Sequence, residues 1–295
     1  MNQQNRLRGI VVGVDGSRAA QDAVRWAARE AVLRDVPVTI VHVLAALPVA
    51  AAALTWPVGR VPEEVMAALE NDGRRYVADA VTSARECVDG AKLDVTGELL
   101  IGHPVRALTE VSAAGLFLVM AGHDGSGKHH RLLGSVSTGV LHHAQCPVVV
   151  VHDVAPQTGH LPVLVGIDGS TASEAATAIA FDEASWRGVD LVALHVWSDA
   201  DMTSLPSLET SAQQRVAEET LAQRMAGWQE KYPDVVVHRL VRYDRPAQQL
   251  LEESYRAQLV VVGSRGRGGF AGLILGSVSV TVAQEARIPV IVVRG

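Results

Sequence analysis

The sequence contains few cysteines, few aromatic residues and no large excess of either charge. Its 295 residues include two cysteines, too few for a disulfide framework or a four-thiolate zinc site, which favours a reducing compartment. Aromatic residues make up 4% of the chain, too sparse for a base-stacking platform. A net charge of −6 argues against a broad electrostatic hold on nucleic acid, so no nucleic-acid partner is expected.

A membrane span and a signal peptide are also not expected. The N-terminus is polar and leads into a strand-like segment. Residues 36–58 carry no formal charge and are long enough to cross a bilayer, but Pro37, Pro48 and Pro57 would break a helix there. The β-branched residues 38–41 favour a strand followed by a loop. A soluble, cytoplasmic protein without a membrane partner is expected.

The sequence does contain an internal repeat. Its repeated segments are residues 11–17 and 164–170, His42-Val43 and His195-Val196, and residues 133–137 and 275–279. The first two pairs are 153 positions apart and the last pair 142. Together with the length, this indicates two like domains, 1–153 and 161–295, with their boundary in the segment 154–161, which proline and glycine interrupt.

Each copy alternates short apolar runs with amphipathic stretches. In the first copy this predicts strands at 9–15, 38–44, 93–101, 116–121 and 148–152, and helices at 18–34, 62–89, 104–114 and 134–144. Nearly continuous apolar strands separated by helices predict a parallel sheet covered on both faces. The fold class is therefore α/β, with two tandem doubly wound domains of five strands each. Ser17 and Ser170 are expected N-caps, and Thr171 with Glu174 fits a capping box.

An aspartate closes the first strand of each copy. Asp15 follows Gly13, and Asp168 follows Gly166. In open α/β sheets, ligands bind beyond the carboxyl ends of the strands, where a carboxylate could accept ribose hydroxyls or hold a metal carried by phosphates. Such an aspartate could equally stabilise the start of the next helix. The residues alone leave both roles open.

A glycine-rich segment follows the fourth strand of each copy. In the second copy, Gly263, Gly266 and Gly276 precede Ser277, with Arg265 and Arg267 between them. Glycines let a backbone approach a phosphate closely, and the next helix adds its N-terminal dipole. A flexible surface loop would explain one such segment but not a second one at the equivalent place.

The first copy departs from this spacing. Gly122 and Gly125 keep theirs, but eight residues separate Gly125 from Gly134, one fewer than in the second copy. Residues 128–131, Lys-His-His-Arg, replace glycine-rich sequence. The shorter, bulkier loop puts phosphate binding by the first copy in doubt.

These residues together resemble the ATP-binding type of the universal stress protein family, in the tandem form found in actinobacteria. The pattern G-x2-G-x9-G-S/T is matched in full by Gly263, Gly266, Gly276 and Ser277. The resemblance covers both copies and implies an adenine nucleotide alpha hydrolase-like fold with strand order 3-2-1-4-5. That order places each aspartate beside the glycine loop of its own copy.

The resemblance also implies a set of nucleotide-binding residues. The ribose would lie at the aspartates, adenine at the backbone of Val43 and Val196, and the phosphates at the glycine loops and the serines that follow them. The implied residues are Gly13, Asp15, Val43, Gly122, Gly125, Gly134 and Ser135 in the first copy, and Gly166, Asp168, Val196, Gly263, Arg265, Gly266, Arg267, Gly276, Ser277, Val278 and Ser279 in the second.

The function that follows is ATP binding, with Mg accompanying the ATP, by a non-enzymatic regulator of stress response or growth. No general base for attacking water is visible, so no catalytic residue is assigned and hydrolysis is expected to be slow or absent. A protein partner of unknown identity is expected, and a homodimer is plausible. Two alternatives remain, a slow ATP hydrolase and a nucleotide-free interaction scaffold.

Competing motifs are incomplete. Residues 122–129 miss a P-loop by one residue, because His129 stands where Ser or Thr would hold magnesium. Residues 266–271 fit G-x-G-x-x-A, but no strand-ending acid follows at the required distance. His142 and Cys146 offer two metal ligands without a third, so no metal site is assigned. His42 and His195, on apolar strands, are interpreted as core histidines with satisfied hydrogen bonds.

Overall fold

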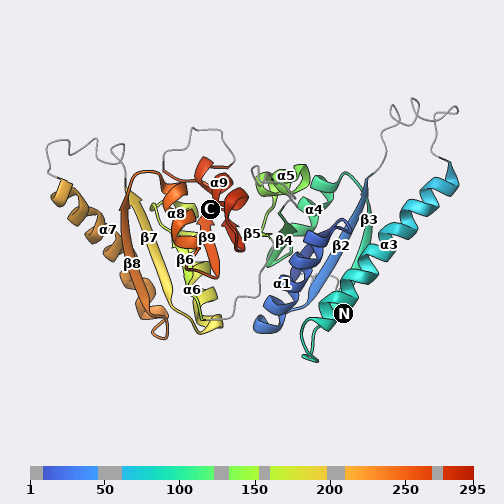
Figure 1. Cartoon of the computed structure of the whole chain (residues 1–295), viewed down its shortest axis with the longest axis horizontal. Helices are drawn as coiled ribbons and strands as arrows, with labels where there is room; N and C mark the ends of the chain where they lie inside the picture. Colours follow the sequence, from blue (N-terminus) through green and yellow to red (C-terminus); the bar gives the residue numbers. More distant parts are fainter. Residues whose placement is uncertain (1–8, 46–61, 123–132, 153–159, 198–209, 268–274) are drawn as a thin grey trace. The chain divides into compact units, whose positions relative to one another are not determined.

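The computed structural model describes residues 9–45, 62–122, 133–152, 160–197, 210–267 and 275–295 (Figure 1). The described chain forms two compact units. One holds the elements from β1 to α5, and the other holds the elements from β6 to β10 together with β5 from Val149 on. The expected domain boundary at 154–161 lies almost entirely outside the described residues, so the domain limits stay a prediction.

The first half contains five strands in the order β3-β2-β1-β4-β5. They are β1 (Ile10–Val14), β2 (Val38–Ala45), β3 (Val95–Gly102), β4 (Phe117–Ala121) and β5 (Val148–Val151). β1 runs parallel to both β2 and β4, and β2 runs parallel to β3. The Leu118 N–H donates to the Pro147 carbonyl just before β5. These strands match the five expected from the sequence to within two residues at each end.

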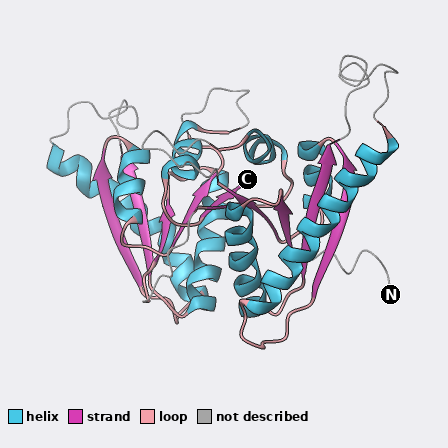
Figure 2. Ribbon diagram, turned by 45° about the vertical axis from the view of Figure 1, so that its right-hand side comes forward, coloured by secondary structure: helices cyan, strands magenta, loops and turns pink. Residues whose placement is uncertain are grey.

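Within the described ranges, four helices cover this sheet. They are α1 (Arg18–Arg34), α3 (Glu63–Glu86), α4 (Pro104–Ser112) and α5 (Ser135–His143). α1 and α3 contact each other and the strands on one side, while α4 and α5 form a second pair. Figure 2 shows helices on both sides of the strands. A buried stripe of small residues, including Ala23, Ala27 and Ala28, lets α1 approach the sheet closely.

The second half repeats this architecture, with strand order β10-β9-β6-β7-β8. Its strands are β6 (Val163–Gly166), β7 (Leu191–Trp197), β8 (Val237–Tyr243), β9 (Leu259–Gly263) and β10 (Val290–Val293), and its helices are α6 (Thr171–Arg187), α7 (Thr210–Lys231), α8 (Pro246–Ser254) and α9 (Ser277–Glu285). All registered pairs within it are parallel. Read from the edge strand inward, the order is again 3-2-1-4-5, so the fold class expected from the sequence is confirmed.

The uncharged stretch 36–58 contributes a strand, as expected. Its residues Val38–Ala45 form β2, and the residues from 46 on lie outside the described ranges. Within the described ranges, no helix combines the length and the apolar character needed to cross a membrane.

Serine caps begin the first helix of each half, but the expected capping box is wrong. Ser17 Oγ accepts from the Ala20 N–H at 3.1 Å, and Ser170 Oγ accepts from the Ser173 N–H at 3.2 Å. Thr171 is the first helical residue and not the cap, because the extended backbone belongs to Ser170. No reciprocal bond to the cap forms, because the Ser170 N–H donates to Asp168 Oδ1 at 2.9 Å, while Ser173 Oγ accepts from the Asp168 N–H at 3.1 Å.

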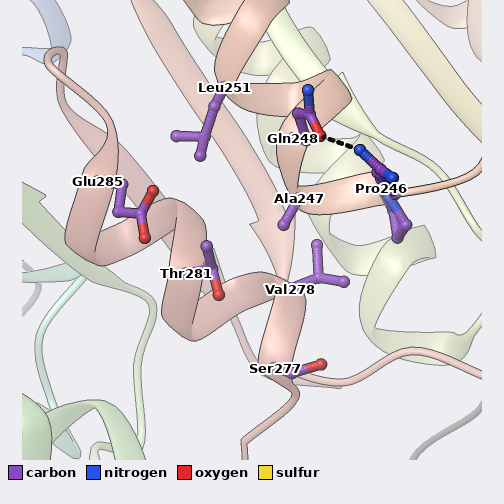
Figure 3. Close-up of a pocket in the computed structure, with 9 residues that line it drawn as sticks. Pro246, Ala247, Gln248, Leu251, Ser277, Val278, Thr281 and Glu285 are labelled. Atoms are coloured by element: carbon purple, nitrogen blue, oxygen red, sulfur yellow. Dashed lines mark hydrogen bonds between the residues drawn. The ribbon is translucent and has the colours of Figure 1, made fainter.

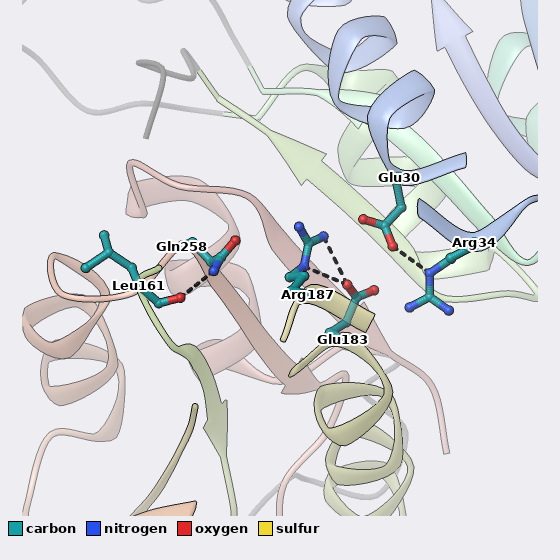
Figure 4. Close-up of polar contacts among 6 residues, drawn as sticks. All are labelled: Glu30, Arg34, Leu161, Glu183, Arg187 and Gln258. Carbon is teal, nitrogen blue, oxygen red and sulfur yellow. Dashed lines mark hydrogen bonds and ion pairs between the residues drawn. The ribbon is translucent and has the colours of Figure 1, made fainter. Parts of the chain in front are cut away.

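Each half also buries an ion pair near the end of its first helix (Figure 4). Glu30 pairs with Arg34 at 2.5 Å, and Glu183 pairs with Arg187 at 3.0 Å. The two glutamates are 2% and 0% exposed. Burying a carboxylate is costly unless a cation and hydrogen bonds compensate it, and the arginine four residues later does so. The pairs lie 153 positions apart, so the repeat extends to this interior feature.

We expect Phe181→Ala to lower the free energy of unfolding of the second half by about 3–5 kcal/mol. Phe181 is fully buried and stacks on Trp228 and Tyr232 with ring centroids 5.8 and 5.2 Å away, so truncation leaves a cavity between α6 and α7. Urea denaturation followed by circular dichroism measures the effect. Trp186→Gln on the same helix is the control, because Trp186 is 51% exposed and should change stability by less than about 0.5 kcal/mol. Equal effects of the two substitutions would contradict the assigned packing.

Candidate functional site

The first strand of each half ends in an Asp-Gly-Ser turn. Gly16 and Gly169 have φ values of +82° and +78°, in the left-handed region that favours glycine. Asp15 Oδ1 accepts from the Ser17 N–H at 3.0 Å, and Asp168 Oδ1 accepts from the Ser170 N–H at 2.9 Å. Each aspartate therefore stabilises the turn that leads into α1 or α6, one of the two roles that the sequence left open.

In the second half, the glycine loop lies directly against this turn. The Arg267 N–H donates to Asp168 Oδ2 at 3.0 Å, and Ser170 Oγ lies 3.0 Å from the Arg265 carbonyl oxygen. A Cβ on Gly266 would overlap Asp168 Oδ2, so this close approach requires glycine. The structure thus brings together Asp168 and the start of the loop, residues that lie about a hundred positions apart, as the strand order implied.

The loop returns to the start of α9 at Gly276. The Gly276 N–H donates to the Ser264 carbonyl at 2.7 Å, and helix α9 begins at Ser277. A Cβ on Gly276 would lie at an ordinary 3.4 Å from its nearest neighbour, and φ is −80°, so neither packing nor backbone conformation demands glycine here. No side chain caps this helix. The amides in the first turn of α9 therefore have no side-chain acceptor, and a helix N-terminus of this kind can bind an anion.

The first half shows the same open helix start. Gly134 is the N-cap of α5, lacks a side-chain acceptor, and has no atom within 4 Å of an added Cβ. Ser135 follows as the first residue of α5. Gly122 ends β4 with its N–H donating to the Val151 carbonyl at 2.7 Å, and a Cβ there would overlap the His152 ring. Gly125 and the rest of the shortened loop lie outside the described residues.

Several residues of the implied set pack against the protein itself. A Cβ on Gly263 would lie 2.7 Å from the Ala172 backbone, and one on Gly13 would lie 2.7 Å from the Met120 sulfur. On Gly166 it would meet the Leu250 side chain at 3.3 Å. Ser279 Oγ donates to the Gly263 carbonyl at 2.6 Å. These contacts fix the strand ends from which the turn and the loop begin, and the ligand-binding roles implied for these residues stay predictions.

The histidines of the second strands join neighbouring strand ends. The Nδ1–H of His42 donates to the Val14 carbonyl at 2.7 Å, and that of His195 donates to the Ile167 carbonyl at 2.6 Å. Because a carbonyl only accepts, these bonds place a proton on Nδ1. Their interpretation as satisfied core histidines is confirmed. Val43 and Val196 follow at the same edge, half-buried, next to the carbonyls that precede Asp15 and Asp168.

Sequence reasoning missed the side chains that cover the two turns. In the first half the Tyr76 ring lies over Gly16 and meets His42 edge-on at 5.5 Å. In the second half the Arg224 guanidinium lies over Gly169. Both come from the long helix after the second strand, α3 or α7, at positions 148 residues apart. Because this separation differs from the offset of 153 positions in the repeat, the sequence comparison of the two copies did not show that these positions are equivalent.

The cysteines and the candidate metal ligands contribute no reactive centre to this edge. Burial raises the pKa of the Cys146 thiol to about 12, and burial also raises the pKa of Cys87. Both thiols are therefore protonated at neutral pH. In the portion of the chain that the structure describes, no three His, Cys, Asp or Glu side chains gather as a metal site would need.

A pocket of about 490 Å³ adjoins the start of α9 (Figure 3). Its lining residues are Arg245, Pro246, Ala247, Gln248, Leu251, Ser277, Val278, Thr281 and Glu285. Figure 3 shows the α8 side chains facing those of α9, with Ser277 at one end. Ser277 and Val278 belong to the nucleotide-binding set implied by the sequence, whereas Asp168 does not line this pocket.

Comparison with known proteins identifies the family. The Universal stress protein family model matches residues 7–152 and again 161–294. The chain is 50% identical over 299 residues to Universal stress protein Rv2623 of Mycobacterium tuberculosis, an alignment that covers 100% of this chain and 99% of that protein.

One solved structure that covers nearly the whole chain shows the same fold. A universal stress protein from Archaeoglobus fulgidus matches with a TM-score of 0.70 and 22% identity over 98% of this chain and 97% of its own. Another from Archaeoglobus fulgidus, solved in complex with dAMP, matches 48% of this chain and 96% of its own length, with 26% identity and a TM-score of 0.36. With both halves matched by the family model, the chain belongs to the universal stress protein family and carries two copies of its domain.

Proposed function

We propose that this chain is an ATP-binding regulator whose second half holds the nucleotide across the carboxyl edge of β6 and β9. The observation that carries the proposal is the open start of α9. Neither the backbone conformation nor the packing requires glycine at position 276, and the helix that begins there has no side-chain cap. Such a site favours a phosphate, because unpaired amides and the helix dipole both attract negative charge.

The ribose and the adenine would bind at the same carboxyl edge of the sheet as the phosphates. Asp168 accepts the Arg267 N–H, and a ribose hydroxyl is a donor of the same kind. The Val196 backbone, at the end of the neighbouring strand, would meet adenine. The exposed side chains of Arg265 and Arg267 add positive charge beside the phosphates. The first half offers Asp15, Val43, Gly134 and Ser135 in equivalent positions.

The arrangement supports binding better than hydrolysis. Asp168 is a carboxylate that contacts the loop, and its oxygens already accept hydrogen bonds from the Ser170 and Arg267 amides. A general base needs a free lone pair aimed at the attacking water. Mg would arrive with the phosphates, with the Ser277 hydroxyl and water as available oxygen ligands. ATP then acts as a ligand that shifts the equilibrium between conformations, and its hydrolysis is not needed for this effect.

The regulatory setting follows from the family and the composition. We assign the protein to the cytoplasm and to stress response or growth control, with a protein partner that reads the nucleotide state. A homodimer of whole chains also remains part of the proposal.

The first test is the nucleotide that the protein itself carries. We expect freshly purified, heat-denatured protein to release about one to two ATP per chain, two if the shortened first loop also binds. Gly276→Ala should lower ATP affinity at one site by about tenfold or more, because the methyl group holds the phosphate away from the amides. Chromatography of the released nucleotide and calorimetric titration with Mg-ATP measure the two effects.

A matched control substitution distinguishes a loss of ligand contact from a general loss of stability. Gly227→Ala on α7 adds a methyl group where no atom lies within 4 Å, so it should bind ATP as the wild type does. If it changes stability at all, it should stabilise α7 by up to about 1 kcal/mol. Absence of released nucleotide and of Mg-ATP binding by the wild type would refute the proposal and leave an interaction scaffold.

Turnover distinguishes a regulator from a hydrolase. We expect phosphate release from Mg-ATP at or below about 10⁻⁴ s⁻¹, the order seen for phosphoryl-transfer sites that lack an assisting group. Asp168→Asn should weaken binding and leave the turnover per bound nucleotide unchanged, because the carboxylate takes no proton. An Asp168→Asn protein that binds ATP normally but no longer releases phosphate would identify a hydrolase instead.

A further inference from the structure

The pocket between α8 and α9 carries opposite charges. Arg245 is the N-cap of α8 and Glu285 is the last residue of α9, and both line the pocket. Figure 3 shows Glu285 on the opposite side of the pocket from Pro246, the residue that follows Arg245. The pocket therefore offers a ligand a cation on one side and a carboxylate on the other.

The carboxylate of Glu285 is available to a ligand. Among the described residues, no ion pair or hydrogen bond involves it, and Arg287, two residues on, lies over the Tyr255 ring. The C-terminal end of a helix carries partial negative charge, so a cation is favoured beside this carboxylate. The Thr281 hydroxyl, one turn earlier, also makes no hydrogen bond with the described part of the chain, whereas Thr220 in α7 donates to the carbonyl four residues back.

The guanidinium of Arg245 has only weak contacts within the protein. Its Nε lies 3.8 Å from Asp244 Oδ2, and both side chains are exposed, so this ion pair contributes little. Its Nη1 donates to Gln248 Oε1 at 3.4 Å, a long distance for a hydrogen bond. Since an arginine has five N–H donors, Arg245 can still bind an acidic group.

The first half builds the same pair of helices without these charges. Helices α4 and α5 contain nine residues each, as α8 and α9 do. His103 and His143 stand 142 positions before Arg245 and Glu285, the offset of this part of the repeat. The helix pair thus forms with other side chains at both positions, and the two charges distinguish the second half.

The dimensions and the lining of the pocket suit a segment of extended chain. Ser277 and Glu285 are eight positions apart in α9, which corresponds to about 12 Å along a helix. An extended chain covers about 13 Å in four residues and points its first, third and fifth side chains to the same side. Ala247, Leu251 and Val278 also line the pocket and are half-buried, so they offer apolar contact to the middle one of these side chains.

We propose that this pocket docks an extended segment of a partner protein. The segment carries an acidic side chain that meets Arg245, an apolar one two residues away, and a basic one, two residues further, that meets Glu285. Complementary charges at both positions would select this partner, and like charges would repel others. The pocket shares Ser277 and Val278 with the proposed phosphate site, but docking itself does not require ATP. Docking and the proposed function can therefore fail separately.

Peptide titrations of the full-length protein, followed by nuclear magnetic resonance, test this docking. The probes are three pentapeptides with blocked ends, Glu-Ser-Leu-Ser-Lys, Glu-Ser-Leu-Ser-Glu and Lys-Ser-Leu-Ser-Lys. They are added to about 10 mM, so that a millimolar dissociation constant can be measured. The peptide with both charges should bind about two- to fivefold more tightly than the other two, the range of an exposed ion pair, and should shift the amide signals of α8 and α9.

Charge reversal should change which peptide binds best, a gain that a damaged fold does not produce. Glu285→Lys should prefer the doubly acidic peptide and Arg245→Glu the doubly basic one, each by about two- to fivefold. His143→Lys, a change to lysine at the equivalent position of the first half, is the matched control and should keep the wild-type order.

Three results would overturn the proposal. They are equal binding of the three peptides, no shift of the α8 and α9 signals, and unchanged preferences in Glu285→Lys and Arg245→Glu. Shifts of the same signals when the protein alone is diluted would assign the pocket to a second copy of this chain, and would also overturn the proposal.

Discussion

The candidate site depends on one constraint, the alignment of parallel strands. When neighbouring strands run parallel, their carboxyl ends meet at one edge, and whatever follows each strand is brought together there. In the second half this places the Asp168 turn after β6 beside the glycine loop after β9, with one hydrogen bond from the Arg267 amide joining them. Neither segment could form the site alone, because one supplies the acceptor and the other the amides.

The repeat separates what the fold needs from what a ligand would need. Both halves keep the serine cap, the histidine bonded to the preceding strand's carbonyl, and the buried glutamate–arginine pair. Each of these satisfies a polar group inside its own half, so losing it would cost stability. The side chains over the turns differ between the halves, Tyr76 in one and Arg224 in the other. A ligand at the carboxyl edge of the sheet would therefore meet different side chains in the two halves.

Much of the fold could be predicted from the sequence because its signals are local or repeated. A short stretch of sequence is enough to predict the strand at residues 38–44 from its apolar run and the helix α1 from its stripe of small residues. The duplication then fixed the architecture, and the spacing of Gly263, Gly266 and Gly276 located the loop. Ser170 was predicted correctly as the N-cap, but the capping box on Thr171 and Glu174 was wrong, since Ser-Thr neighbours both favour capping and only the backbone conformation distinguishes them. Tyr76 and Arg224 could not be predicted, because their contacts depend on how far a long helix extends over the sheet.

The bond between Asp168 and the glycine loop also bears on how a nucleotide could act as a signal. In the structure, Asp168 Oδ2 accepts the Arg267 N–H, and a ribose hydroxyl that takes the place of this amide would release the start of the loop. The exchange replaces one hydrogen bond with another of similar strength, and its net free energy is therefore small. On the proposed function, affinity would then come from the phosphates at α9, while the exchange at Asp168 would move the start of the loop. A small free-energy difference between two loop positions is what a ligand needs in order to shift a population and expose a different surface to a partner.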